Sequence, residues 1–366
     1  MNAYQLLGSQ ASYYTGKARA YLRYKNIDFE EIAASAEVFE KIIVPRTGVR
    51  FIPVLISPDD QVVQDTTEII DFLEERFPEP SIYPQTPKQR LTSLLLELYG
   101  DEWLVIPAMY YRWWFTEENF DFILREFGKT AHPELSEDEQ REAAKSRAKY
   151  FAGALPNLGI SEKNHKQIEA WYERFLDCFS EHLKTYDFLL GSRPSIGDYG
   201  LIGPLYAHLS RDPYPAKLMR KRAPLVKQWV DRMHDPQPLS GEFLADDMVP
   251  ETLNPILSMM FEEHFPVLID SVEKLHQWRI DHPDKAISRV IGTHSFSIGG
   301  ATEDRLIFPY TQWMFQRPLD YYTTVPADQK QDVDIWLKKI GGYDGMQTSI
   351  PSRVQRIQNI LKFENE

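Results

Sequence analysis

Short apolar runs alternate with helical patterns over the first eighty residues. Runs of strand length lie at 4–7, 28–32, 51–56 and 62–64. Apolar residues at helical spacing predict helices over 15–25, 38–44 and 66–77. The turn signal Pro58-Asp59-Asp60-Gln61 joins the last two strands into a hairpin. This order predicts an α/β unit with a mixed sheet.

Helical patterns dominate after a proline-rich linker at 78–87. The predicted helices lie at 91–114, 136–155, 163–186, from 195 onward, and at 224–233. Capping-box patterns, in which a serine is followed three residues later by an acidic residue, open two of them at Ser136 and Ser195. We therefore expect an α/β domain at 1–84 and an all-helical domain at 85–240.

The remaining residues, 241–366, predict an α/β-hairpin extension that packs on the helical domain. Helical patterns lie at 255–280, 310–319 and 328–340, and residues 354–363 are amphipathic. Apolar and polar residues alternate over 290–308 around Gly299-Gly300, which predicts a β-hairpin. This extension either covers a cleft or is a structural addition.

Composition narrows the class of protein. The chain has 366 residues, of which 43% are hydrophobic, and a formal net charge of −13, which argues against a nucleic-acid partner. The lone Cys178 excludes an internal disulfide and a Cys-x-x-Cys motif. No secretory signal, apolar stretch of membrane-spanning length or His-Glu-x-x-His pattern occurs, so we expect a cytoplasmic protein without membrane contact or metal.

Three features of the α/β unit suit a charged peptide ligand. Ser12 precedes a helix N-terminus, where a hydroxyl and the helix dipole stabilise an anion such as a thiolate. Pro53 interrupts a strand, and a cis bond there would turn the main chain of Ile52 outward. Asp65 and Thr66 open a helix whose N–H groups attract a carboxylate, while the Asp65 side chain suits an ammonium. Each feature alone is equally explained as a helix cap or an edge-strand proline.

Together, these motifs resemble cytosolic glutathione transferases of the serine and cysteine types. The matching segments are Ser12-Tyr13-Tyr14-Thr15-Gly16-Lys17-Ala18-Arg19, Ile52-Pro53-Val54-Leu55, Asp65-Thr66-Thr67-Glu68-Ile69-Ile70 and Ser195-Ile196-Gly197-Asp198-Tyr199. The resemblance implies a thioredoxin-like glutathione-binding domain at 1–84 followed by an all-α domain. It also implies a homodimer and a small hydrophobic electrophile as second substrate.

The resemblance also implies roles for single residues. Ser12 would steady the glutathione thiolate, and the main chain of Ile52, before a cis Pro53, would pair with the cysteinyl part. Asp65 and Thr66 would hold the γ-glutamyl end, and Arg50 is the candidate for the glycyl carboxylate. The family often has Asn-Pro upstream of the cis-proline strand, whereas residues 44–48 here read Val-Pro-Arg-Thr-Gly.

Other hydroxyls near Ser12 also suit the thiolate, because the chemistry requires only a hydroxyl donor. The alternatives are Ser9, Tyr13, Tyr14 and Thr15. The absence of cysteine from this stretch disfavours thiol–disulfide reductase chemistry. The function indicated is glutathione-dependent transfer, and the alternative is a non-catalytic module of the same fold that binds a ligand or protein.

Aromatic residues cluster on the first long helix of the second domain. In the family that the chain resembles, this helix lines the electrophile pocket, which makes Tyr110, Arg112 and Trp114 candidates for substrate contact together with Tyr14. The alternative is a helix core with a dimer contact. A basic run at 217–227 reads as a solvated helix face.

Overall fold

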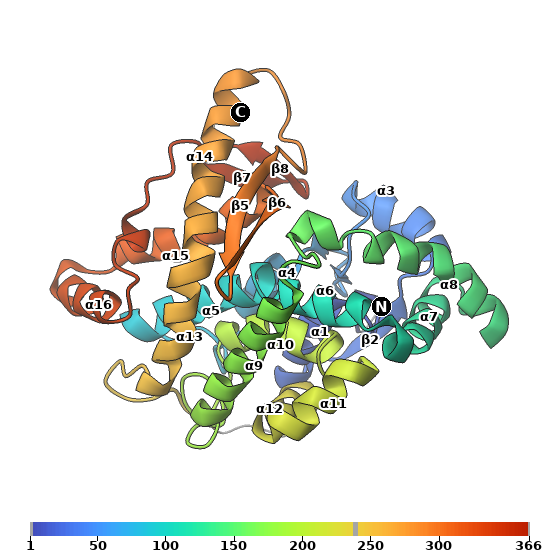
Figure 1. Ribbon diagram of the computed structural model, residues 1–366, viewed down its shortest axis with the longest axis horizontal. Coiled ribbons are helices and arrows are strands. Elements are labelled where there is room, and N and C mark those ends of the chain that lie inside the picture. Colours follow the sequence, from blue (N-terminus) through green and yellow to red (C-terminus); the bar gives the residue numbers. More distant parts are fainter. Residues whose placement is uncertain (1–2, 237–240, 365–366) are drawn as a thin grey trace. The chain divides into compact units, whose positions relative to one another are not determined.

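The computed structural model describes residues 3–236 and 241–364 (Figure 1). The chain forms two compact units. Unit 1 comprises Met1–Ile82, Ala108–Ala154 and Tyr199–Gly241, and unit 2 comprises Tyr83–Pro107, Leu155–Asp198 and Glu242–Glu366. Each unit takes segments from the range expected to be all-helical, so the boundaries at 84 and 240 remain a prediction.

A four-stranded mixed sheet forms the N-terminal part of unit 1. Its strands are β1 (Tyr4–Gly8), β2 (Phe29–Ala33), β3 (Val54–Ile56) and β4 (Val62–Gln64), in the order β2-β1-β3-β4. β1 is parallel to β2 and antiparallel to β3, which is antiparallel to β4. The predicted thioredoxin-like α/β arrangement is confirmed.

Both faces of this sheet are buried. Leu7, Val54 and Ile56 share one face and pack with Phe39 and Ile43. These two side chains come from the helical segment α2 (Ala36–Val38), η1 (Phe39–Ile43) and α3 (Val44–Thr47). The paired Leu6 and Leu55 point to the opposite face, since side chains alternate along a strand, and both are fully buried. The apolar runs in the sequence are therefore the centre of this layer.

Two helices begin at one end of the sheet. α1 (Tyr13–Tyr24) follows β1, and α4 (Thr66–Arg76) follows β4. The helices pack against each other, and the buried Glu74 of α4 accepts a 2.6 Å hydrogen bond from Tyr21 of α1. Lys25 forms a 2.8 Å ion pair with the same carboxylate. These contacts hold the C-terminal ends of the two helices together.

The helical part of unit 1 includes one helix, α7 (Thr116–Ala131), that lies outside every predicted range, and it packs against α8 (Glu137–Ala152). α11 (Pro213–Arg222), which carries most of the basic run, packs against α12 (Pro224–His234). The apolar residues Phe120, Ile123, Leu124 and Phe127 do keep helical spacing in α7. α6 (Val105–Trp114) and α10 (Ile196–Ala207) each begin in residues of unit 2 and end in unit 1.

Unit 2 joins helices to two β-hairpins. Its helices include α5 (Pro87–Glu102), α9 (His165–His182), α13 (Asn254–Met259), α14 (Phe265–Asp281), α15 (Tyr310–Thr324) and α16 (Ala327–Lys339). The predicted hairpin is β5 (Thr293–Ile298) and β6 (Ala301–Leu306), and Figure 1 shows it beside α14. Its turn residues Gly299 and Gly300 have φ of 57° and 81°, where a side chain would be strained.

A second hairpin occupies the amphipathic segment at the C-terminal end. It consists of β7 (Val354–Ile357) and β8 (Ile360–Phe363). The buried Gln316 of α15 pairs with both the N–H and the C=O of Val354, at 2.9 and 2.8 Å. This side chain therefore replaces a neighbouring strand at the edge of β7.

The capping box predicted at Ser136 is present, and at Ser195 the Asp198 side chain supplies its half of the second box. Ser136 and Glu139 cap α8 reciprocally. The buried Asp198 accepts from the N–H and the hydroxyl of Ser195, at 2.8 and 2.9 Å, and from the N–H of Leu189 at 3.1 Å. Among the described residues, no helix combines the length and the apolar character that a bilayer span requires.

Burial of His182, at the end of α9, makes the stability of the protein depend on pH. Burial lowers the pKa of His182 to about 4, although its hydrogen bond to the Phe188 carbonyl opposes the shift. Because Phe188 C=O only accepts, Nε2 donates to it and Nδ1 accepts from Thr252 at 2.8 Å. The folded state thus holds the neutral ring while the unfolded state protonates near pH 6.5.

We predict that the free energy of unfolding falls as pH drops from 6.5 to 4, by about 3 kcal/mol from this residue alone. The stability is present above pH 6.5, since the unfolded state binds the extra proton only below it. Urea unfolding at several pH values measures this loss. His182→Gln, which does not titrate, should show a shallower slope, and equal slopes for both proteins would contradict the assignment.

Candidate functional site

The register of the sheet brings three of the predicted site segments to the same end of adjacent strands. Leu7 pairs with Val54, and Val54 pairs with Gln64, so the next residues, Gly8, Pro53 and Asp65, lie at the same end of adjacent strands. Neighbouring strands are about 4.8 Å apart. Ser12, the Ile52–Pro53 bond and the Asp65-Thr66 pair therefore surround one end of the sheet.

Gly8 lets α1 begin close to the end of β1. A Cβ at this position would lie 2.3 Å from Cγ2 of Thr15, closer than any real side-chain contact. Thr15 is fully buried, and its hydroxyl accepts from the N–H of Ser9 at 3.3 Å. The loop 9–12 is thereby held against the first turn of α1.

The hydroxyl of Ser12 keeps an uncommitted proton. Ser12 is the N-cap of α1, and its Oγ accepts from the N–H of Thr15 at 3.2 Å. No acceptor for its own O–H lies among the described residues. The side chain is half-buried. Ser12 can therefore donate a hydrogen bond to an anion at the helix N-terminus.

The hydroxyl of Ser9 already forms hydrogen bonds within the protein. It accepts from the N–H of Ala11 at 3.3 Å and lies 3.1 Å from the hydroxyl of Thr130. Thr130 donates its own proton to the carbonyl of Glu126 at 2.9 Å, so the proton between the two hydroxyls comes from Ser9. Ser9 has no second proton for a ligand.

The other hydroxyls of the segment differ in burial. Tyr13 is buried, with its ring 4.7 Å from the ring of Tyr14 and 5.7 Å from that of His208. Tyr14 is half-buried, whereas Thr15 is inaccessible. Of these three, Tyr14 has the greatest exposure.

The Ile52–Pro53 peptide bond is cis. Pro53 is buried, and Ile52 packs at the margin of the apolar cluster under β1 and β3. Within residues 3–236 and 241–364, no protein group pairs with the main-chain N–H or C=O of Ile52. This short main-chain edge is open to an extended ligand.

Asp65 caps α4 from an unusual backbone conformation. Its φ is 91° and ψ is 138°, a region that favours glycine, and its carboxylate accepts from the N–H of Thr67 at 2.9 Å. Thr66 is buried beside it. The buried Lys17 of α1 lies with its Nζ 3.4 Å from the hydroxyl of Thr67. The N-terminus of α4 thus combines a cap carboxylate with a nearby ammonium.

Arg50 and the aromatic residues of α6 do not share one environment: Arg50 is exposed, whereas the aromatic side chains are buried or half-buried. Arg50 is exposed on the loop before β3, with its guanidinium 5.2 Å from the ring of Phe39. Tyr110 is fully buried, and its ring lies 5.4 Å from that of the half-buried Trp114. Substrate contact by these residues remains a prediction.

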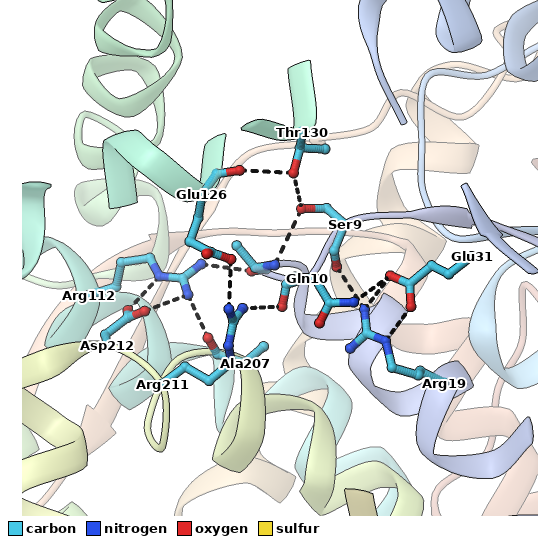
Figure 2. A network of polar contacts seen from close by, with 11 residues as sticks. Ser9, Gln10, Arg19, Glu31, Arg112, Glu126, Thr130, Ala207, Arg211 and Asp212 are labelled. Carbon is cyan, nitrogen blue, oxygen red and sulfur yellow. Dashed lines mark hydrogen bonds and ion pairs between the residues drawn. The ribbon is translucent and has the colours of Figure 1, made fainter. Parts of the chain in front are cut away.

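Arg112 is joined to the Ser12 loop through Ala11. Its Nε and Nη2 bind Asp212 at 2.6 and 2.9 Å, Nη1 donates to the Ala11 carbonyl at 2.9 Å, and Nη2 also reaches the Ala207 carbonyl at 2.7 Å (Figure 2). The side chain is buried. These bonds favour a role in positioning the loop over direct contact with a substrate.

Further charged residues around this loop were not predicted as site residues. They are Arg19, Glu31, Glu126, Arg211 and Asp212. Most lie far apart in the sequence and follow no motif. Arg19 alone could have been found from the sequence, since it lies seven residues after Ser12, two turns along the same face of α1. Among the described residues, no cluster of His, Cys, Asp and Glu side chains is arranged to hold a metal ion.

One unusual backbone position makes a testable prediction. Replacing Asp65 by glycine removes a strained φ at a cost of only a few tenths of a kcal/mol in capping, so Asp65→Gly should raise the free energy of unfolding by about 1 kcal/mol. Asp65→Ala keeps the strain and loses the cap, and should lower it by about 1 kcal/mol. Urea unfolding compares them, and a glycine variant less stable than the alanine variant would refute the strain.

Comparison with known families matches two parts of the chain. Residues 6–81 match the model of the glutathione S-transferase N-terminal domain, and residues 136–235 match that of the glutathione S-transferase C-terminal domain. Neither match reaches beyond residue 235. No curated protein sequence matches the chain significantly.

Solved structures similar to the chain include three bacterial proteins. A GST-like protein of Pseudomonas syringae has 20% identity and a TM-score of 0.43, covering 64% of this chain and 67% of its own. The β-etherase LigF of Sphingobium sp. strain SYK-6 has 20% identity and a TM-score of 0.46, covering 65% and 96%. A glutathione S-transferase of Methylobacterium radiotolerans, in complex with glutathione sulfonate, has 19% identity and a TM-score of 0.39, covering 64% and 92%. With such values, the family assignment rests on the two domain models.

Proposed function

Because the chain belongs to the glutathione S-transferase superfamily, we propose that it is a glutathione-dependent transferase in which Ser12 stabilises the glutathione thiolate. One observation carries this assignment. At the N-terminus of α1, the hydroxyl of Ser12 has a proton to donate, whereas the hydroxyl of Ser9 already donates a hydrogen bond to that of Thr130.

Glutathione would lie along the edge of the sheet. The main chain of Ile52 would pair with its cysteinyl residue, as an added strand pairs with an open edge. Asp65 would bind the γ-glutamyl ammonium, while Thr66 and the N-terminus of α4 would bind the γ-glutamyl carboxylate. Arg50, exposed on the adjoining loop, would bind the glycyl carboxylate.

The chemical step begins with loss of the thiol proton to solvent. The Ser12 hydroxyl and the dipole of α1 would then stabilise the thiolate, and each pKa unit of depression represents about 1.4 kcal/mol of preference for the anion. The thiolate attacks the electrophile, a sulfur–carbon bond forms, and the leaving group departs with its electron pair. Conjugation, dehalogenation, ether cleavage and isomerisation all share this attack.

The second substrate would be a small apolar electrophile. The half-buried side chains of Tyr14 and Trp114 supply apolar surface of the right chemistry on α1 and α6, and the fully buried Tyr110 packs against Trp114. The protein would act in the cytoplasm as a homodimer. The alternative, a non-catalytic ligand- or protein-binding module, is favoured by one feature: the residues beyond 235 lie outside both domain matches.

The role of Ser12 is tested by paired alanine variants. Ser12→Ala should raise the pKa of the bound glutathione thiol by about one unit or more and lower kcat by about 10- to 100-fold, because one charge-assisted hydrogen bond is lost. Ser136→Ala, which removes the hydroxyl of another serine N-cap, the exposed one of α8, serves as the matched control and should leave this pKa within a few tenths of a unit. Thiolate ultraviolet absorbance across a pH series measures the pKa.

Three outcomes separate the possibilities. A pKa raised by Ser12→Ala alone supports the proposal. Equal behaviour of wild type and Ser12→Ala transfers the role to another hydroxyl, with Tyr14→Phe as the next variant. Failure of the wild-type protein to bind glutathione in calorimetry would overturn the transferase and favour the binding module.

A further inference from the structure

Three arginines hold the main chain of the loop that carries Ser12. We propose that Arg19, Arg112 and Arg211 are positioning residues, which orient the loop 9–12 so that the Ser12 hydroxyl faces the sulfur of glutathione. This inference rests on the proposed function and extends it to residues that do not touch the substrate.

The three arginines bind three consecutive carbonyls. Arg19 Nη2 donates to the Ser9 carbonyl at 3.2 Å, Arg211 Nη1 to the Gln10 carbonyl at 2.5 Å, and Arg112 Nη1 to the Ala11 carbonyl at 2.9 Å (Figure 2). Hydrogen bonds from charged donors are stronger than those between neutral groups. Every carbonyl between β1 and Ser12 after Gly8 is thus fixed by its own guanidinium.

Each arginine is in turn held by a carboxylate on a different element. Arg19 of α1 forms two 2.6 Å bonds to Glu31 of β2. Arg211 binds Glu126 of α7 at 2.7 Å. Arg112 of α6 binds Asp212, the residue that precedes α11. The loop is therefore fixed from several directions at once.

The side chains of the loop are committed as well. Ser9 donates to Thr130, and the amide of Gln10 donates to Glu31 at 3.1 Å. The N–H of Ser12 closes a turn onto the Ser9 carbonyl at 3.1 Å. The hydroxyl proton of Ser12 has no acceptor among the described residues and is therefore available to a ligand.

Stability alone is a poor explanation for this arrangement. Arg112 and Asp212 are both buried, and a buried ion pair is often no more stabilising than apolar side chains of the same size, because desolvation offsets the attraction. Burial raises the pKa of Asp212, while the guanidinium of Arg112 opposes that shift. The ion pairs instead fix the orientation of each arginine, because the planar guanidinium holds its N–H groups in a rigid fork.

The orientation has a consequence for an anion at α1. A carbonyl oxygen turned toward a thiolate would repel it and raise its pKa. The three carbonyls instead point their oxygens at guanidinium groups. Because each arginine is paired with a carboxylate, the cluster adds little net charge, and its effect is to orient dipoles.

Arg211 offers the cleanest test, because its side chain is only partly buried. We expect Arg211→Gln to raise the pKa of the bound glutathione thiol and to lower kcat about tenfold, with little change in the KM for glutathione, since a displaced group loses catalysis more than binding. Arg112→Lys, which keeps the charge but loses the fork, should act in the same direction. Arg125→Gln is the matched control, because Arg125 also pairs with a carboxylate, Asp121, on the exposed surface of α7.

Hydrogen exchange at the amides of Ala11 and Ser12, which both donate to Ser9, provides a readout that does not need glutathione. Exchange should be about tenfold faster in Arg211→Gln and unchanged in Arg125→Gln, if the arginine orders the loop. An unchanged thiol pKa in Arg211→Gln and Arg112→Lys, with reduced stability, would make the arginines merely structural. If wild type does not bind glutathione, the transferase is refuted. In that case, unchanged exchange in Arg211→Gln would refute the ordering role too, and faster exchange would support it.

Discussion

The register of β1, β3 and β4 is the constraint on which the site depends. Leu7, Val54 and Gln64 lie in one row, so the end of β1, the Ile52–Pro53 bond and the start of α4 meet at one edge. A slip of one residue in either strand would move its side chains to the opposite face and break the packing of Leu7 or Val54 against Phe39 and Ile43. The same packing that stabilises the core therefore assembles the glutathione-binding groups.

Much of this edge could be predicted from sequence because its signals are local. An apolar run marks a strand, Pro53 marks an interruption in it, and Asp65 and Ser12 are of the residue types that cap helices. The choice among neighbouring hydroxyls could not be predicted. It depends on Thr130, which lies more than a hundred residues from Ser9 and accepts a hydrogen bond from its hydroxyl. The partners of Arg112 were equally hidden, since Asp212 and Ala11 are joined to it only by the fold.

The sequence patterns located the strands of the sheet more completely than they located the helices. The predicted helices did not include α7. This helix carries Glu126, which pairs with Arg211, and Thr130, which bonds Ser9 in the loop before Ser12. In the C-terminal segment, alternation predicted β5 and β6, whereas the edge of β7 is paired by Gln316, a polar side chain from a distant helix. Contacts of that kind leave no periodic trace in the sequence.

A crystal structure of the protein with glutathione would show whether this end of the sheet binds glutathione with its sulfur at Ser12. We expect the sulfur within hydrogen-bond distance of the Ser12 hydroxyl and the cysteinyl main chain paired with Ile52. A sulfur nearest another hydroxyl, or a peptide bound away from the ends of β1, β3 and β4, would contradict it.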